Sequence, residues 1–74
     1  MENPILANRL RLGMTRREFA RQAGYSYENC GFYENGLRLS LSDRAAQAFS
    51  KILRMTPEQL QIQYSKWKKT VMLP

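Results

Sequence analysis

Apolar positions recur along this chain at intervals of three and four residues, and no segment alternates apolar and polar residues as a strand would. This spacing predicts helices throughout the chain. The first helix is expected over residues 3–12, because Pro4 suits a first helical turn and Gly13 is a typical helix terminator. Ile5 and Leu12 fall near one face of that helix and are expected to pack inward.

The next segment has the capping residues and the helix terminator expected of two short helices joined by a tight turn. Thr15 and Glu18 have the spacing of a capping box, in which two side chains reciprocally accept hydrogen bonds from free backbone N–H groups. Gly24 ends this second helix, and Ser26 is the expected N-cap of a third helix over residues 27–35. Two short helices about a turn that contains glycine are typical of a helix-turn-helix unit.

Two longer helices are predicted after a loop at residues 37–41. The first of them begins near Ser40 or Ser42. Its apolar stripe consists of Ala45, Ala48, Phe49, Ile52 and Leu53. The second begins at another capping box, formed by Thr56 and Gln59 with a proline at the first helical position. Its apolar residues at helical spacing are Leu60, Tyr64, Trp67 and Val71. The chain is therefore predicted to be all-α, with five helices.

We divide the chain into a helix-turn-helix core at residues 1–56 and a C-terminal helix with its tail at residues 57–74. Leu60 is expected to close the core, whereas Trp67 is expected to lie too far along the helix to reach it. The apolar residues beyond Leu60 then need another partner. The candidate dimer interface consists of Tyr64, Trp67 and Val71. Residues 72–74 form a short apolar tail that we expect to fray.

The composition limits the chemistry that the chain can perform. A chain of 74 residues has room for one small domain, whose core needs further stabilisation. The single cysteine, Cys30, excludes an internal disulfide and is expected to be a small buried hydrophobe. Because histidine is absent and no glycine-rich phosphate loop occurs, we expect no metal, no cofactor and no enzymatic activity. A second copy is then the available source of stability, and we expect a homodimer.

The charge balance indicates a polyanionic partner. Lys and Arg number 12 against 6 Asp and Glu, and the resulting net charge of +6 favours nucleic acid or an anionic membrane surface. No apolar run is long enough to span a membrane, and the first residues lack the basic and apolar regions of a signal peptide. We therefore expect a soluble cytoplasmic protein that keeps its thiol reduced and lies on the nucleoid when it binds DNA.

Residues 14–26, MTRREFARQAGYS, followed by YENG at residues 33–36, resemble the helix-turn-helix of the Cro and lambdoid repressor family, also called the XRE family. A looser likeness extends over residues 49–60. The resemblance implies a lambda-repressor-like domain of five helices, whose third helix enters the major groove of double-stranded operator DNA. It also implies a small Cro-like transcriptional regulator of phage or plasmid type that acts as a dimer on an inverted repeat.

The resemblance assigns roles to individual positions of this chain. The residues that would face base edges are Tyr27, Glu28, Asn29 and Phe32. The residues that would contact phosphates, from the family positions and the arginines that flank them, are Arg16, Arg17, Arg21, Asn35, Arg38 and Arg44. Arg9 and Glu34 match a structural ion pair between the first and third helices, which is expected to be partly buried.

The third helix departs from the family pattern. Cys30 stands where the family usually has a larger aliphatic residue, and Gly31 costs about 1 kcal/mol relative to alanine within a helix. Residues 27–35 contain two carboxylates and no Lys or Arg, so phosphate attraction must come from the flanks. The remaining base contacts are a glutamate that accepts from cytosine, an asparagine on adenine and an aromatic ring on a thymine methyl.

Some of these residues also have a plainly structural interpretation. Tyr25 and Tyr33 align with core positions. Three arginines are either phosphate contacts or a solvated helix face: Arg16, Arg17 and Arg21. Three lysines either solubilise the last helix or bind phosphate or a membrane weakly: Lys66, Lys68 and Lys69. Because the aromatic pair Tyr27 and Phe32 lies beside a carboxylate and also suits a protein groove, the alternative function is a protein-interaction module such as an antitoxin.

Overall fold

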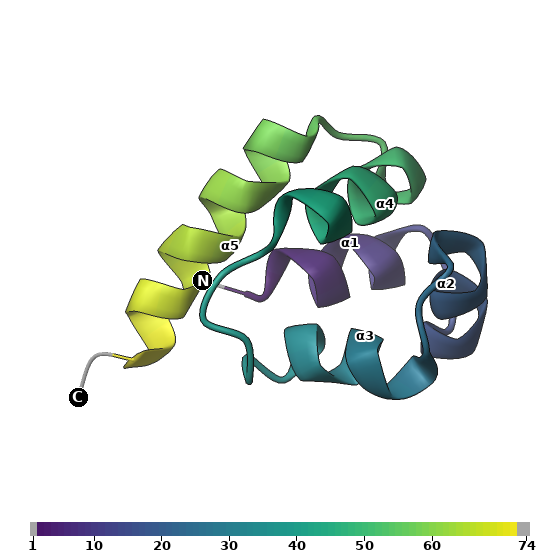
Figure 1. Cartoon of the computed structure of the whole chain (residues 1–74), viewed down its shortest axis with the longest axis horizontal. Coiled ribbons are helices and arrows are strands. Elements are labelled where there is room, and N and C mark those ends of the chain that lie inside the picture. The colour runs from purple at the N-terminus through teal and green to yellow at the C-terminus, as the bar shows by residue number, and fades with distance from the viewer. Residues whose placement is uncertain (1, 73–74) are drawn as a thin grey trace.

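The computed structural model describes residues 2–72, which contain five α-helices. Their bounds are α1 (Pro4–Arg11), α2 (Arg16–Ala23), α3 (Tyr27–Glu34), α4 (Asp43–Leu53) and α5 (Pro57–Met72). The predicted all-α class with five helices is confirmed, and no strand occurs among residues 2–72. In Figure 1, α1 runs through the middle of the molecule between α3 and α4, and α5 crosses at the end opposite α2. Of the tail expected to fray, residue 72 closes α5 and residues 73–74 lie outside the described residues.

Each of the five helices begins at an N-cap side chain, whose oxygen accepts a hydrogen bond from a backbone N–H of the first turn. These caps are Asn3, Thr15, Ser26, Ser42 and Thr56. Of the two predicted starts for the fourth helix, the structure therefore selects Ser42. Because short polar side chains at helix starts act on neighbouring backbone groups, these boundaries are decided locally.

The two predicted capping boxes differ in the structure. The box at the start of α5 is complete, since the Thr56 N–H donates to Gln59 Oε1 (3.0 Å) and the Gln59 N–H donates to Thr56 Oγ1 (3.1 Å). At the start of α2 only the Glu18 N–H donates to Thr15 Oγ1, at 3.1 Å. The Glu18 carboxylate accepts instead from Arg21 Nη2 at 2.9 Å, because a charged donor competes with the backbone. The prediction of a capping box is therefore confirmed for the hydrogen bond to the Thr15 side chain and wrong for the one to the Glu18 side chain.

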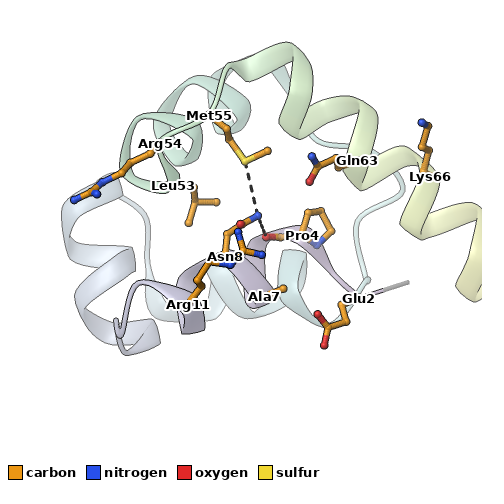
Figure 2. A pocket seen from close by; sticks show the side chains of 10 residues that line it. All are labelled: Glu2, Pro4, Ala7, Asn8, Arg11, Leu53, Arg54, Met55, Gln63 and Lys66. Atoms are coloured by element: carbon orange, nitrogen blue, oxygen red, sulfur yellow. Dashed lines mark hydrogen bonds between the residues drawn. The ribbon is translucent and has the colours of Figure 1, made fainter.

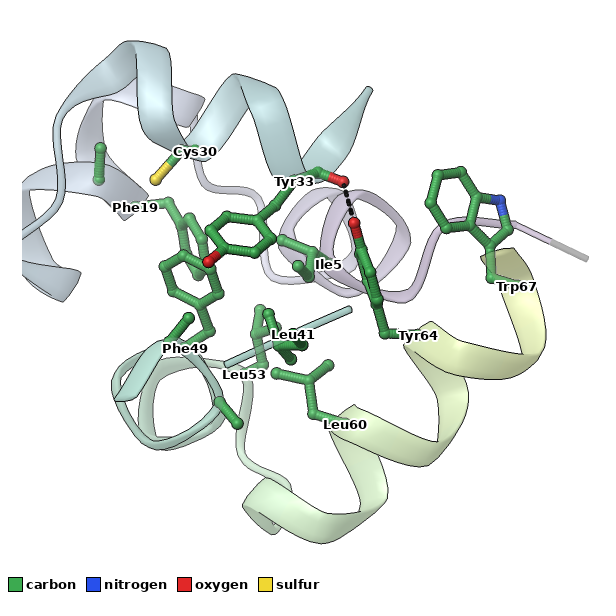
Figure 3. Close-up of a cluster of buried hydrophobic side chains, with 13 residues drawn as sticks. Ile5, Phe19, Cys30, Tyr33, Leu41, Phe49, Leu53, Leu60, Tyr64 and Trp67 are labelled. Carbon is green, nitrogen blue, oxygen red and sulfur yellow. Dashed lines mark hydrogen bonds between the residues drawn. The ribbon is translucent and has the colours of Figure 1, made fainter. Parts of the chain in front are cut away.

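The hydrophobic core is centred on Phe49 of α4 (Figure 3). The ring centroids of Phe19, Tyr25 and Tyr33 lie 5.1, 5.0 and 5.5 Å from that of Phe49. Both tyrosines contribute to the core as predicted, Tyr33 buried and Tyr25 packed against its edge. The prediction for Cys30 is also confirmed: it is fully buried, and burial raises the pKa of its thiol from 9.0 to about 11.

The C-terminal helix α5 is part of this core. Tyr64 is fully buried and Trp67 is only 8% exposed, and their ring centroids lie 5.6 Å apart. The expectation that Trp67 does not reach the core was therefore wrong, and so was the assignment of Tyr64 and Trp67 to a dimer interface. The physical reason is that α5 packs across α1 and α4, so its apolar stripe stays covered from Leu60 to Trp67. Val71 remains about half exposed. A division at residue 56 consequently does not separate two packed units.

Candidate nucleic-acid interface

A helix-turn-helix is formed by α2, the turn at residues 24–26 and α3. Gly24 lies in the left-handed region (φ 73°), and the Tyr25 N–H donates to the Ala20 carbonyl at 3.0 Å, which closes the C-terminal end of α2. Ser26 Oγ then accepts from the Asn29 N–H at 3.1 Å and starts α3. This turn fixes the angle between the two helices, because both of its ends are hydrogen-bonded to neighbouring backbone.

The outward face of α3 carries the predicted base-reading residues. Tyr27 is 50% exposed, Phe32 is 37% exposed and Glu28 is also exposed, whereas Asn29 is partly buried. Cys30 of the same helix faces the core. Two aromatic rings and one carboxylate are therefore presented to the surface from one short helix, which is unusual for a solvated face.

The predicted ion pair between Arg9 of α1 and Glu34 of α3 is present. Arg9 Nε lies 2.8 Å from Glu34 Oε2 and Arg9 Nη2 lies 3.1 Å from Oε1, so the contact is bidentate. A third donor of Arg9, Nη1, reaches the Met14 carbonyl at 2.7 Å. The pair is buried rather than partly buried, because the Glu34 side chain has no exposed surface. It therefore anchors the end of α3 to α1.

Arg16 of α2 also binds Glu34. The family resemblance implied that Arg16 steadies the third helix, but it did not identify Glu34 as the partner. Arg16 Nε and Nη2 each lie 3.2 Å from Glu34 Oε1, and the guanidinium carbon lies 5.2 Å from the centroid of the Tyr27 ring. A Cβ added at Gly31 would lie 3.0 Å from Arg16 Nη1. The glycine inside α3, expected only to destabilise the helix, thus makes room for this arginine. Arg16 is held against α3 and keeps about a quarter of its side chain exposed.

The other predicted phosphate contacts lie on the surface: Arg17, Arg21, Asn35, Arg38 and Arg44. Arg21 forms an exposed ion pair with Glu18 (2.9 Å), a type of contact that contributes little to stability. The guanidinium carbon of Arg38 lies 5.1 Å from the centroid of the Phe32 ring, and Arg38 Nη2 donates to Asn29 Oδ1 at 3.4 Å. Arg16 and Arg38 therefore lie against the two exposed aromatic rings of α3, one on each.

Three residues that support α3 were missed or misassigned from the sequence: Asn3, Tyr64 and Lys68. All of them donate hydrogen bonds to backbone carbonyls at the C-terminal end of α3 or in the loop that follows. Burial raises the pKa of the Tyr64 hydroxyl to about 12. Lys68 was expected to be a solvated or phosphate-binding lysine, yet it is only 8% exposed. Its place four residues after Tyr64, on the same helix face, was the signal available in the sequence.

A separate hollow lies between α1, α4 and α5 (Figure 2). Arg11, Arg54 and Lys66 stand around it, and Asn8 Nδ2 donates to the Pro4 carbonyl (2.7 Å) on its floor. None of the predicted DNA contacts lines this hollow. The candidate site is therefore the exposed face of α3 and not this hollow.

The fold and the turn between α2 and α3 define a helix-turn-helix protein. The sequence matches the family model described as "Helix-turn-helix" over residues 5–60, which is more than half of the chain. The chain belongs to this family, the Cro/XRE-type DNA-binding regulators, whose members are usually not enzymes. The comparisons with curated proteins and with solved structures give no match. Within residues 2–72, no helix combines the length and the apolar character needed to cross a membrane.

Proposed function

We propose that this chain is a sequence-specific transcriptional regulator, Cro-like and of phage or plasmid type, that binds double-stranded operator DNA. In this proposal α3 enters the major groove, and Tyr27, Glu28, Asn29 and Phe32 face the base edges. The observation that carries it is the exposed aromatic and acidic face of α3, held by the turn beside a set of arginines. Its place of action is the nucleoid, in the cytoplasm.

The distribution of charge supports DNA as the ligand. The Glu34 carboxylate is enclosed between two arginines, so Glu28 is the one exposed carboxylate of α3. The proposed phosphate contacts surround it: Arg16, Arg17, Arg21, Asn35, Arg38 and Arg44. The ion pair of Arg21 is exposed and weak, so a phosphate can replace Glu18 as its partner. Phosphate contacts of this kind supply affinity and fix the register of the helix, while base contacts supply discrimination.

We further propose a dimer on an inverted repeat, with its contact away from Tyr64 and Trp67. Leu37 and Leu39, in the loop after α3, are exposed apolar side chains that suit such a contact. A contact there would bring the α3 helices of two copies close to one two-fold axis, as binding to an inverted repeat needs. Sedimentation equilibrium of the Leu37→Ser/Leu39→Ser variant tests the placement, with Ile62→Ser as the matched exposed control on α5. Only the double variant is expected to weaken association.

Selection of bound duplexes from a random library tests the function as a whole. We expect an enriched inverted repeat whose half-sites are about 34 Å apart, one turn of the duplex. Binding of the selected duplex should weaken steeply with salt because phosphate contacts release counterions. If no sequence is enriched and the chain instead forms a tight complex with a co-encoded protein, the protein-interaction alternative replaces this proposal.

A further inference from the structure

The carbonyl groups at the C-terminal end of α3 are bound by side chains from distant parts of the chain. Asn3 Nδ2 donates to the carbonyls of Tyr33 and Glu34, both at 3.0 Å. The last carbonyls of a helix have no partner within it, so such donors satisfy groups that would otherwise need water. The N-terminal end of α1 is thereby attached to the end of α3.

Helix α5 extends this attachment into the loop that follows α3. The Tyr64 hydroxyl donates to the Arg38 carbonyl at 2.8 Å and lies 3.4 Å from the Tyr33 carbonyl, as Figure 3 shows for the latter. Lys68 Nζ donates to the Gly36 carbonyl. Trp67 covers the same glycine, since a Cβ added there would lie 2.7 Å from Trp67 Cη2. Three residues of α5 thus contact one short stretch of backbone.

Lys68 is an unusual residue for this position. It is 8% exposed, and its ammonium forms no salt bridge with a carboxylate among residues 2–72. Three interactions stabilise the buried ammonium: the Gly36 carbonyl, the Trp67 ring at 6.0 Å, and the negative end of the α3 dipole. A buried charge with so few partners is costly. Its location at the end of α3 indicates a role in fixing that backbone.

The contact is transmitted to the reading face through Arg38. Tyr64 holds the carbonyl of Arg38, while the guanidinium of the same residue lies against the Phe32 ring and donates to Asn29. A shift of the loop would therefore move the side chain that orients two of the proposed base contacts. Tyr64, Trp67 and Lys68 all lie beyond residue 60, where the match to the family model ends.

We propose that Tyr64, Trp67 and Lys68 are positioning residues of the DNA-reading helix. They hold the end of α3 and residues 35–38 in one geometry, so that Phe32, Asn29 and Arg38 meet the duplex together. This inference rests on the proposed function, because the geometry matters through DNA recognition. It assigns the last turns of α5 a part in specificity, although none of its three residues needs to touch DNA.

The test compares three full-length variants on two duplexes, one selected by the wild-type protein from a random library and one scrambled. Tyr64→Phe removes a single hydroxyl and Lys68→Met a single charge, while Lys66→Met removes a charge from an exposed neighbour on α5. Tyr64→Phe and Lys68→Met are expected to weaken binding of the selected duplex roughly tenfold, the loss of one hydrogen bond of this kind. Binding of the scrambled duplex, and the salt dependence on both, should stay as in Lys66→Met.

Two results in this assay would overturn the proposal. If Lys68→Met weakens both duplexes equally and lowers the salt slope by about one, Lys68 is a phosphate contact instead. If Tyr64→Phe and Lys68→Met bind both duplexes as Lys66→Met does, the contacts with α5 play no part in recognition.

Amide hydrogen exchange of the free protein separates this inference from the proposed function. The reporter is the Leu37 N–H, which donates to the Phe32 carbonyl at 2.9 Å. We expect Tyr64→Phe and Lys68→Met to accelerate its exchange while the amides of α2 and α4 keep their rates. Equal acceleration in all helices, or none at Leu37, overturns the positioning role even if DNA is bound. If exchange is accelerated locally at Leu37 in a protein that binds no DNA, the contacts of α5 with the end of α3 are supported and only the proposed function is contradicted.

Discussion

The turns before and after α3 use the same backbone geometry in different surroundings. Gly24 and Gly36 both adopt left-handed φ values, 73° and 75°, and each lies in a turn that closes a helix. Around Gly24 a Cβ would find no atom within 4 Å, whereas at Gly36 it would meet Trp67. The N-terminal end of α3 is therefore open at the surface, and its C-terminal end is enclosed by α1 and α5. An open end can approach a duplex, while an enclosed end fixes the direction from which it does so.

The largest expected effect is on the free energy of unfolding, when Glu34 at the enclosed end of α3 is replaced. Glu34→Ala leaves Arg9 buried without its carboxylate, and unfolding free energy should fall by about 3–5 kcal/mol, as for other buried pairs with one partner removed. Arg9→Ala should cost a similar amount. Chemical denaturation of both variants and of the double variant measures the coupling. If the double variant loses the full sum of the two single losses, the bidentate contact does not stabilise the fold.

The second prediction compares the two glycines directly. Gly24→Ala should cost about 1–2 kcal/mol, the strain of a left-handed backbone alone. Gly36→Ala adds overpacking against Trp67 and should cost about 2–4 kcal/mol. Thermal melts of the two variants, run side by side, give the difference. Equal losses at both positions would mean that Trp67 moves aside freely and that the enclosed end is looser than its packing indicates.

The same contrast explains which features were predictable from the sequence. The start of α3 depends on Gly24, on Ser26 and on residues within a turn of them, so local patterns identified it. The end of α3 depends on Lys68 and Trp67, more than thirty residues away. Helical spacing shows which residues share a face but not which element covers that face, and this is why the residues of α5 were assigned to a dimer.

The ion pair and the recognition face were predictable only through the family resemblance. Composition and spacing alone do not indicate that Arg9 and Glu34 meet, since they lie on different helices. The contact of Arg16 with Glu34 was not predicted, because the place of Arg16 depends on an absent side chain: Gly31 leaves the space that the guanidinium occupies. A glycine within a helix carries no such information without the neighbouring helix in view.

The third prediction concerns the open end of α3. Glu28→Ala should relax the preference at one base pair of each half-site by about 1–3 kcal/mol, if this carboxylate accepts from a cytosine amino group. Affinity for scrambled DNA should rise at the same time, because a charge repelled by phosphates is removed. Repeating the duplex selection with the variant shows both effects. An unchanged consensus with uniformly tighter binding would exclude Glu28 as a reader and favour a protein partner for this face.

The smallest expected effect is a change of stability with pH that comes from Cys30, which lies between the two ends of α3. Its pKa is raised to about 11 by burial, so the folded state holds the thiol proton more tightly than the unfolded chain does. Stability from this residue is therefore complete below pH 9 and is lost as the pH rises towards 11. At pH 10 the loss should be about 1 kcal/mol, from the shift between the two values.

Cys30→Ala removes the titrating group and keeps a small apolar side chain, so it isolates this contribution from the tyrosines. The unfolding free energies of the wild-type protein and of the variant are measured at pH 8 and at pH 10. The difference between the two proteins should be larger at pH 8, where the thiol of the wild-type protein is still protonated in both states. A constant difference would mean that the thiol ionises as readily in the folded chain as in the unfolded one, and that the core around α3 admits water.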